Sequence, residues 1–387
     1  MQRQEESGED IVIVGAGIAG LAAALGLHRK GVRSVVLESS PALRASGFAL
    51  ATWPNAFRAL DALGVGDQIR KLHLRIEELR VMSASTGEIS NEVDYRDEFC
   101  CVRRDVLLHV LAAELPTGTI RYSSKIVSID EHFDGAKILH LADGSTLRAK
   151  VLPSHSGRSA TRGLALYPDG HGLPPKFLQF FGHGFRFGFM PCNDTDVYWF
   201  YTWSTSTDDH GVDESRAKMK QNVLTKLRSS KVPAEALELV ERTEDAPVVP
   251  LRFRPPLSLL FAGISKGNVC VAGDALHPMT PDLGQGGCAA LEDGVVLARC
   301  LGEAILAGDG DGATGGSEKE RIDSCLRRYV GIRRWRSIEL IGTAYIVGFF
   351  QQSNNRIISF LREKVLAGVL VGRLVKMSDH DCGTLSS

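Results

Sequence analysis

The chain has 387 residues, of which 44% are hydrophobic and 24% charged, so it is long enough to bury a large core in two or three domains. Its 45 lysines and arginines almost balance its 46 acidic residues, and a net charge of -1 argues against a general binder of nucleic acid. The eight cysteines form no C-x-x-C pair and have no zinc-like spacing with histidine, so we expect no metal site and a reduced, cytoplasmic protein.

The first predicted elements form a strand–helix–strand unit. Residues 11–14 are a short apolar run typical of a buried parallel strand, and residues 21–29 are rich in alanine and leucine, which indicates a helix. A second apolar strand follows at 34–37. Strand, helix and strand within about thirty residues are typical of a βαβ unit. The polar residues 1–10 leave no room for a secretory or transit signal.

A glycine-rich turn, GAGIAG at residues 15–20, joins the first strand to the helix and fits the G-x-G-x-x-G pattern. Its first glycine allows the tight turn, its second lets the backbone approach a pyrophosphate, and its third lets helix and strand pack closely. Phosphates would bind at the helix N-terminus, where free N–H groups and the helix dipole favour negative charge. The predicted cofactor contacts in this turn are Gly15, Gly17, Ile18, Ala19 and Gly20.

An acidic residue, Glu38, ends the second strand. Its carboxylate is placed to accept hydrogen bonds from a ribose diol, and its charge disfavours a 2′-phosphate, so the site is predicted to take FAD or NAD rather than NADP. The alternative interpretation of this strand–helix–strand pattern is a βαβ unit that binds no ligand.

The next part of the chain is predicted to alternate between helices and strands. Residues 55–63 and 102–115 have the apolar spacing of helices. Residues 77–93 alternate like exposed strands. Residues 125–151 are predicted to be antiparallel strands with a hairpin turn at Asp143-Gly144.

The strongest strand pattern lies in the middle of the chain. Residues 162–203 are rich in aromatics and glycines and suit an open sheet with one covered face, which we expect to be the substrate platform. Residues 213–243 indicate two helices, and residues 248–253 one further strand. Residues 268–272 return to the buried-strand pattern of the N-terminus, and a helix follows at 287–306.

The last part of the chain is predicted to be helical and basic. From Arg321 to Lys376 it holds eleven lysines and arginines but only three acidic residues. Such a stripe is typical of a solvated helix face, although the apolar stretches 357–361 and 365–370 leave open a peripheral contact with anionic membrane. No stretch is long and apolar enough to span a bilayer.

A second motif separates the candidate cofactors. GDALHP at 273–278 follows the predicted strand, and GQGG at 284–287 opens the long helix. This order resembles the second FAD fingerprint of the class A, single-component flavoprotein monooxygenases, and within that family it looks closest to the plant monooxygenases related to salicylate hydroxylase. The resemblance implies a contact of Asp274 with the ribityl chain and a position of the 284–287 turn beside the isoalloxazine, where a helix N-terminus stabilises the charge of reduced flavin. The residues assigned in this way are Asp274, Gly284, Gly286 and Gly287.

Further residues match the family in part. The R-x-x-L pattern that begins at Arg104 resembles the helix whose arginine reaches the flavin, with Arg103 as the competing candidate. Arg44 and Gly47 resemble a stretch close to the flavin. His277 is expected to have a packing and positioning role, because chemistry on a flavin scaffold usually belongs to the cofactor. No catalytic residue is assigned.

One motif of the family is missing. An Asp-Gly turn with a following serine and arginine is expected after the strand that ends at Val151-Leu152, but the chain continues directly with Pro153. Asp143-Gly144 precedes that strand and does not replace the turn. Both flanks resemble the family, so an internal segment is missing. The motif serves both FAD binding and the approach of NAD(P)H in the family, and its loss makes a catalytically impaired isoform one alternative.

The resemblance implies a reaction in which FAD is reduced by transiently bound NADH or NADPH and takes up O2. The resulting flavin C4a-hydroperoxide hydroxylates or epoxidises a small aromatic or otherwise unsaturated substrate. That substrate would lie between the flavin and a sheet that contains Phe187, Phe189, Tyr198 and Trp199, whose alternative role is ordinary packing. An FAD-dependent oxidase and a non-enzymatic binding protein remain as alternatives.

The predicted fold is α/β, with a Rossmann-type FAD-binding domain on a parallel sheet, an interleaved mixed or antiparallel substrate domain, and C-terminal helices. The predicted domains are FAD-binding at 10–75, 97–158 and 265–310, substrate-binding at 76–96 and 159–264, and C-terminal helical at 317–387.

Overall fold

The computed structural model describes most of the chain. The described residues are 11–43, 48–131, 137–141, 154–204, 216–307, 317–352 and 367–386. Arg44, Gly47 and the site of the missing motif around Leu152 lie outside them.

The N-terminal unit is the predicted parallel βαβ arrangement. Strand β1 (Ile11–Val14) leads into helix α1 (Ile18–Arg29), and β2 (Ser34–Leu37) pairs with β1 in parallel, with Val12 opposite Val35. The short β7 (Ile120–Arg121) continues the sheet beyond β2. The leucines and alanines of α1 are buried, which explains why this segment needs no polar face. The predicted α/β fold class is confirmed.

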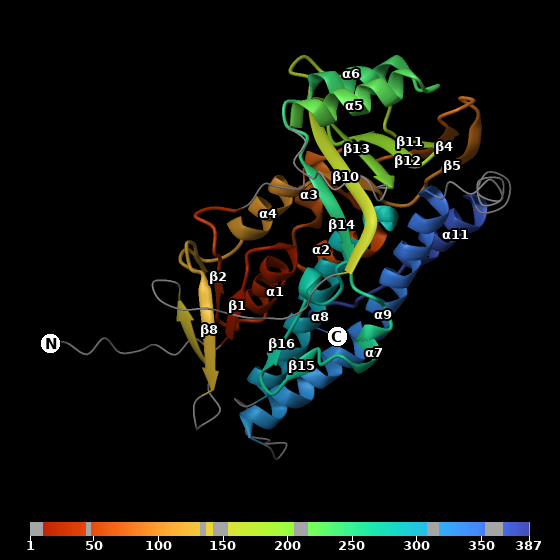
Figure 1. Ribbon diagram of the computed structural model, residues 1–387. Coiled ribbons are helices and arrows are strands. Elements are labelled where there is room, and N and C mark those ends of the chain that lie inside the picture. Colours follow the sequence, from red (N-terminus) through yellow and green to blue (C-terminus); the bar gives the residue numbers. More distant parts are fainter. Residues whose placement is uncertain are drawn as a thin grey trace.

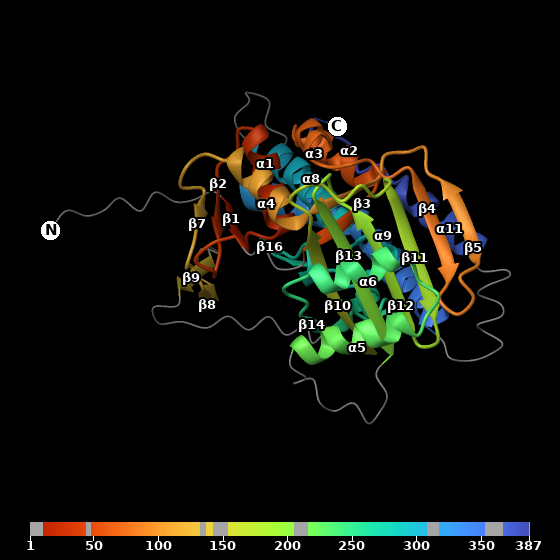
Figure 2. The same ribbon diagram turned by 90° about the horizontal axis from the view of Figure 1, so that it is seen from above.

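A mixed seven-stranded sheet forms the second layer (Figures 1 and 2). In spatial order it consists of β14 (Val248–Phe253), β10 (Ser154–Leu166), β13 (Asp196–Ser204), β12 (Phe185–Pro191), β11 (Lys176–Gly182), β4 (Glu78–Ser83) and β5 (Ile89–Asp94). Only the β4–β11 pair is parallel. Helices α5 (Arg216–Arg228) and α6 (Ala234–Arg242) cover one face of this sheet.

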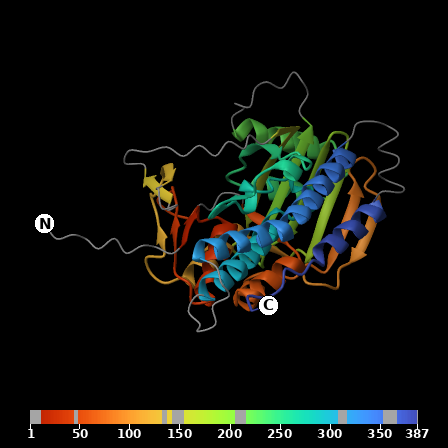
Figure 3. The same cartoon turned by 90° about the horizontal axis from the view of Figure 1, so that it is seen from below.

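Long helices join the two layers. Helix α8 (Gly286–Leu306) is almost completely buried and packs on α1, where a Cβ at Gly294 would lie 2.4 Å from the Ala22 side chain. Helix α9 (Glu318–Gln352) lies along α8, and α11 (Ala367–Ser378) follows it near the C-terminus (Figure 3). No described helix is long and apolar enough to cross a membrane. The apolar stretches 357–361 and 365–370 lie wholly or partly outside the described residues.

The shorter elements refine the predicted boundaries. The predicted helix at 102–115 is the strand β6 (Cys100–Arg103) followed by α4 (Arg104–Ala113), because residues 100–103 pair with β3 (Ala49–Thr52). The remaining short elements are α2 (Pro54–Ala62), α3 (Gly66–Leu72), α7 (Ser258–Phe261), η1 (Gly273–Ala275) and η2 (Pro281–Leu283).

The predicted hairpin turn at Asp143-Gly144 falls outside the described residues and stays a prediction. Strand β8 (Ile126–Glu131) pairs antiparallel with β9 (Lys137–Leu141), so their connection lies between residues 131 and 137. Asp143 and Gly144 follow β9 and lie outside the described residues.

The predicted buried strand at 268–272 is wrong. Only β16 (Val269–Cys270) forms there; it pairs with β15 (Ser265–Lys266), and Val269 is exposed. Within the described part of the chain, β1 also has only one strand neighbour, β2. Val12 and Val14 are 36% and 60% exposed, whereas their register partners Val35 and Leu37 are buried. Parallel sheets are normally covered on both faces. Within the described residues, this sheet is therefore less well covered at β1 than at β2.

Candidate functional site

A cavity of about 560 Å³ lies between the β1–α1 turn, the N-terminus of α8 and the seven-stranded sheet. Its first wall is the glycine-rich turn, and the predicted contacts Gly15, Gly17, Ile18, Ala19 and Gly20 all line it. Gly15 has φ of +98°, which favours glycine. A Cβ at Gly20 would lie 2.1 Å from the Gly15 carbonyl oxygen, whereas a Cβ at Gly17 would meet nothing within 4 Å. Gly20 is thus required by packing, and Gly17 leaves open space.

The second wall is formed by η1 and the start of α8. Asp274, Gly284, Gly286 and Gly287 all line the cavity. Gly284 has φ of +63°, and a Cβ there would lie 2.9 Å from Ala51. The open N-terminus of α8 faces this wall, so unpaired backbone N–H groups and the helix dipole favour an anionic or electron-rich ligand group.

The two neighbouring arginines at the start of α4 point to different partners. Arg103 forms ion pairs with Asp105 and Asp196 at 2.6 and 2.7 Å, which raise its pKa. Arg104 lines the cavity. Strand β6 ends at Arg103 and helix α4 begins at Arg104. Of these two neighbours, Arg104 is the one that lies at the candidate site.

Glu38 lies against the glycine-rich turn rather than among the residues that line the cavity. Its Oε2 accepts a hydrogen bond from the Ala16 N–H at 2.9 Å, and its Oε1 accepts one from the Ser40 N–H at 2.8 Å. The carboxylate is nearly buried. In this arrangement Glu38 stabilises the turn, and any ribose contact would use its remaining lone pairs.

One side of the cavity, where the sequence predicts the substrate, is the face of the seven-stranded sheet opposite α5 and α6. Tyr198 and Phe200 line it, and burial raises the pKa of Tyr198 to about 12. The odd-numbered neighbours point the other way: Phe187, Phe189 and Trp199 pack under α5 and α6. Of the four aromatics predicted at the substrate, only Tyr198 faces the cavity, because successive side chains of a strand alternate between faces.

Charged residues on this face were not predicted from the sequence. Arg162 and Arg186 line the cavity, and burial lowers the pKa of Arg186 to about 10. Arg186 donates to Gln179 Oε1 at 3.0 and 2.6 Å, and its guanidinium lies 4.9 Å from the Phe200 ring centroid. Side chains alternate along β12, and Phe185 and Phe187 point toward α5 and α6. Arg186 between them therefore points to the opposite face, and this alternation is the sequence signal that could have predicted its position.

A buried ion pair between Arg158 and Asp282 connects the seven-stranded sheet to the second wall. Both oxygens of Asp282 accept from Arg158, at 3.0 and 2.7 Å, and Arg186 Nη1 lies 3.6 Å from Asp282. Gly348 of α9 makes room for this pair, since a Cβ there would lie 2.4 Å from atoms of both residues. The pair joins β10 to the segment that leads into the 284–287 turn.

The cavity fits the predicted cofactor in two respects. Its glycine-lined walls leave the backbone accessible to a pyrophosphate and a ring system. Two buried polar atoms at its edge, Trp53 Nε1 and Thr280 Oγ1, have no hydrogen-bond partner among the described residues. Among the described residues, no group of histidine, cysteine and acidic side chains has a metal-binding arrangement.

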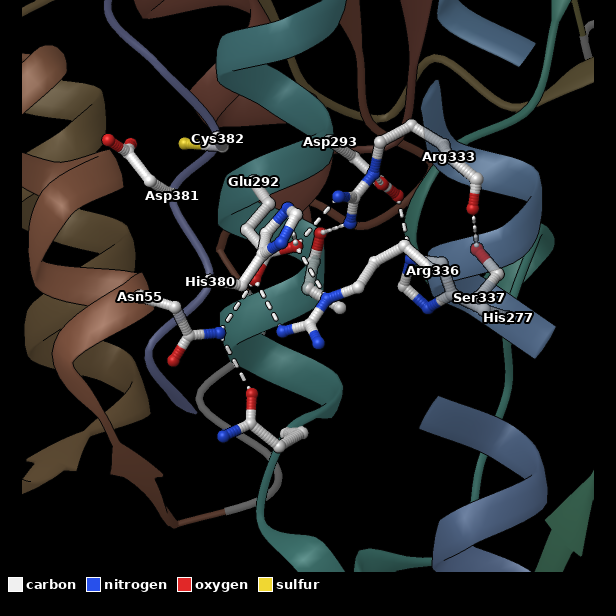
Figure 4. Close-up of polar contacts among 12 residues, drawn as sticks. Asn55, His277, Glu292, Asp293, Arg333, Arg336, Ser337, His380, Asp381 and Cys382 are labelled. Carbon is white, nitrogen blue, oxygen red and sulfur yellow. Dashed lines mark hydrogen bonds and ion pairs between the residues drawn. The ribbon is translucent and has the colours of Figure 1, made fainter. Parts of the chain in front are cut away.

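Behind the second wall, buried ionisable residues of α8 and α9 form a network (Figure 4). His277 is fully buried there, with Nε2 2.7 Å from Asp293 Oδ2. It does not line the cavity, which agrees with the predicted positioning role.

Comparison with known proteins assigns this architecture. Residues 10–231 match the family model for lycopene cyclase protein, and residues 175–315 match that for an FAD binding domain. Only the second model includes the 273–287 segment. The chain is 48% identical to Monooxygenase 2 of Arabidopsis thaliana, over 99% of both chains, and 36% identical to Monooxygenase 1 of the same plant, over 97% and 99%. Among solved structures, Klebsiella pneumoniae HpxO complexed with FAD and uric acid matches with a TM-score of 0.75 at 21% identity, covering 95% of this chain and 96% of that one. A salicylate hydroxylase substrate complex matches with a TM-score of 0.70 at 18% identity, covering 95% and 97%.

The alignment with Monooxygenase 2 also contains gaps within this chain. It runs over 412 positions, whereas this chain has 387 residues, so at least 25 positions (412 less 387) have no counterpart here. Because 99% of both chains is covered, these positions are internal. The position of the missing Asp-Gly segment between the two fingerprints stays a prediction.

Proposed function

This chain belongs to the class A, single-component family of FAD-dependent monooxygenases, and from that premise we propose that it binds FAD in the 560 Å³ cavity and uses NADH or NADPH and O2 to hydroxylate or epoxidise a small aromatic or otherwise unsaturated substrate. The single observation that carries the proposal is the convergence of both predicted fingerprints, far apart in the sequence, on one cavity.

We infer that the two walls hold different parts of FAD. The glycine-rich turn and the N-terminus of α1 would bind the pyrophosphate, and Glu38 would hold the turn that presents it. Asp274 and Arg104 would contact the ribityl and phosphate region, and the 284–287 turn would face the flavin ring. Bound FAD would accept electrons from NAD(P)H and react with O2, which is chemistry that no protein side chain provides.

The charge of the substrate side supports an acidic substrate. Arg162 and Arg186 line this side, and the nearby acid, Asp282, lies 2.7 Å from Arg158 and 3.6 Å from Arg186, so positive groups outnumber negative ones among these four residues. Tyr198 and Phe200 offer apolar ring faces beside these cations. We propose an aromatic compound with a carboxylate or other anionic group, which the arginines would orient and the aromatic walls would shield from water.

The test is the visible absorption spectrum of the purified chain, with the released flavin identified after denaturation. We expect about one FAD for each chain after incubation with FAD, and NAD(P)H oxidation that aromatic acids accelerate. Release of all electrons as H2O2, whatever aromatic acid is added, would favour the oxidase alternative.

A second candidate, a catalytically impaired isoform, is favoured by the exposed valines of β1 and the at least 25 unmatched positions. A chain that stays colourless after incubation with FAD would overturn the monooxygenase proposal and support this alternative.

A further inference from the structure

Two adjacent carboxylates on α8 are linked to the two segments that form the second wall of the cavity, one directly and the other through Asn55. Glu292 and Asp293 are completely buried. Asp293 Oδ2 accepts hydrogen bonds from the Gly273 N–H and from His277 Nε2, both at 2.7 Å. These two contacts hold the start and the end of the 273–277 turn, whose Asp274 lines the cavity.

Glu292 reaches the other turn through one intermediate residue. Asn55 Nδ2 donates to Glu292 Oε1 at 2.6 Å and to Gln285 Oε1 at 2.9 Å. Gln285 lies within the 284–287 turn and immediately precedes α8. Figure 4 shows Asn55 between the α8 carboxylates and this turn. All three side chains are buried, so water does not replace these contacts.

Two arginines of α9 compensate the negative charges of Glu292 and Asp293. Arg333 Nε donates to Asp293 Oδ1 at 2.5 Å, and its Nη1 donates to Glu292 Oε2 at 2.7 Å. Arg336 Nη2 lies 3.1 Å from Glu292 Oε1 and also donates to the Met377 carbonyl oxygen at 2.8 Å. Burial alone would raise the pKa values of both acids, but Arg333 and its neighbours outweigh it and hold Glu292 at about 2. The acids stay ionised and keep accepting hydrogen bonds.

We propose that Glu292 and Asp293 are positioning residues that set the two turns separately: Asp293 holds the 273–277 turn directly, and Glu292 holds the 284–287 turn through Asn55. Helix α9 supplies the two counter-charges. The functional consequence, that this device controls FAD affinity, rests on the proposed function. The separate control of the two turns does not.

The first experiment measures amide hydrogen exchange in the ligand-free full chain. Asn55→Leu keeps the side-chain shape but removes the link between Glu292 and Gln285. We expect exchange in residues 284–289 to become at least ten-fold faster, with less than a two-fold change in residues 273–277. Asp293→Asn should reverse the pattern. If that variant does not fold, because Arg333 loses a partner, His277→Leu tests the same turn.

The matched control is Thr243→Val, which removes a buried hydrogen bond to Trp199 Nε1 on the far face of the sheet. It should change exchange in neither turn. If Asn55→Leu accelerates amide exchange equally in both turns, or in neither of them, the inference is overturned.

The second experiment measures FAD binding and the midpoint potential of the bound flavin. We expect Asn55→Leu to raise the Kd for FAD about ten-fold and to lower the potential, because N–H groups of a looser turn stabilise reduced flavin less well. Thr243→Val should lower the Tm without either change. An unchanged Kd and potential in Asn55→Leu would overturn the functional part. If the unmodified chain binds no FAD, the proposed function fails, but the exchange experiment still decides whether the turns are set separately.

Discussion

The two walls of the cavity differ in how completely their atoms are partnered. The wall from α8 is supported from behind by buried carboxylates, two arginines and Asn55. The wall from β1 has the predicted glycine-rich turn, but within the described residues its strand has one neighbour and exposes Val12 and Val14. The α8 wall is thus held by a buried charged network, whereas the β1 wall is held by Glu38 at its turn and lies beside a partly exposed strand.

The largest effect is expected for Arg333→Met on the supported side. This change leaves Glu292 and Asp293 buried without their shared cation, and breaking such a buried pair costs about 3–5 kcal/mol. Urea denaturation measures the loss. The matched control, Arg327→Met, removes an exposed pair with Asp323 on the same helix and should cost less than about 1 kcal/mol. Similar losses in both variants would show that the network does not stabilise this wall.

Acid should weaken the same network. The folded-state pKa of Glu292 is about 2, below its ordinary value of 4.5, so its contribution is fully present above pH 4.5 and is lost as the pH falls toward 2. We expect the free energy of unfolding to fall by about 2–3 kcal/mol more over this range than in Glu292→Gln, which has no charge to lose there. Denaturation curves at several pH values measure the difference, and parallel curves for the two chains would contradict the prediction.

The glycine-rich turn offers a contrast between packing and ligand binding. Gly20→Ala places a Cβ 2.1 Å from the Gly15 carbonyl oxygen and should cost about 1–3 kcal/mol of stability. Gly17→Ala meets no atom within 4 Å, so the ligand-free chain should keep its Tm while FAD binds at least ten-fold more weakly. A Gly17→Ala chain with unchanged FAD affinity would exclude close approach of the cofactor to this turn.

Local sequence patterns predicted those parts of the site whose structure depends on residues close together in the sequence. The βαβ unit, the glycine-rich turn and the 273–287 segment follow from strand and helix patterns at short range. The basic tail was interpreted as a solvated helix face, yet Arg333 and Arg336 are buried, because their carboxylate partners lie about forty residues earlier, on α8. Only the packing of α9 on α8 reveals that pairing.

The same limit explains the other differences. Strand alternation was available for the aromatic sheet, and it would have separated Tyr198 from Trp199 had the covered face been known. The 268–272 segment has the sequence of a buried strand, but a strand is buried only if its neighbours are present. Here β16 is only two residues long, pairs antiparallel with the equally short β15, and leaves Val269 exposed.

Restoring the missing segment should make the two walls more alike. The variant to make carries, after Leu152, the positions of Monooxygenase 2 that have no counterpart in this chain, and we predict that they restore the Asp-Gly turn that the family resemblance implies. We expect FAD to bind about ten-fold more tightly, which is about 1.4 kcal/mol, because more of the cofactor site is held in place. Fluorescence titration with FAD measures the change. A scrambled insertion of the same length is the control, and an equal gain from it would contradict a specific role of the segment.

The smallest effect should come from Val12→Thr, one member of a register pair on the β1–β2 sheet. Val12 and Val35 lie opposite each other on one face, but Val12 is 36% exposed and Val35 only 3%. Val35→Thr buries a hydroxyl group and should cost about 1–3 kcal/mol. Val12→Thr should stay within about 0.5 kcal/mol, because its hydroxyl reaches water. Urea denaturation compares the two. Equal losses would mean that β1 is as well covered as β2 in solution, and the contrast between the two walls would then disappear; a difference of the expected size would locate the uncovered part of the fold at β1 itself.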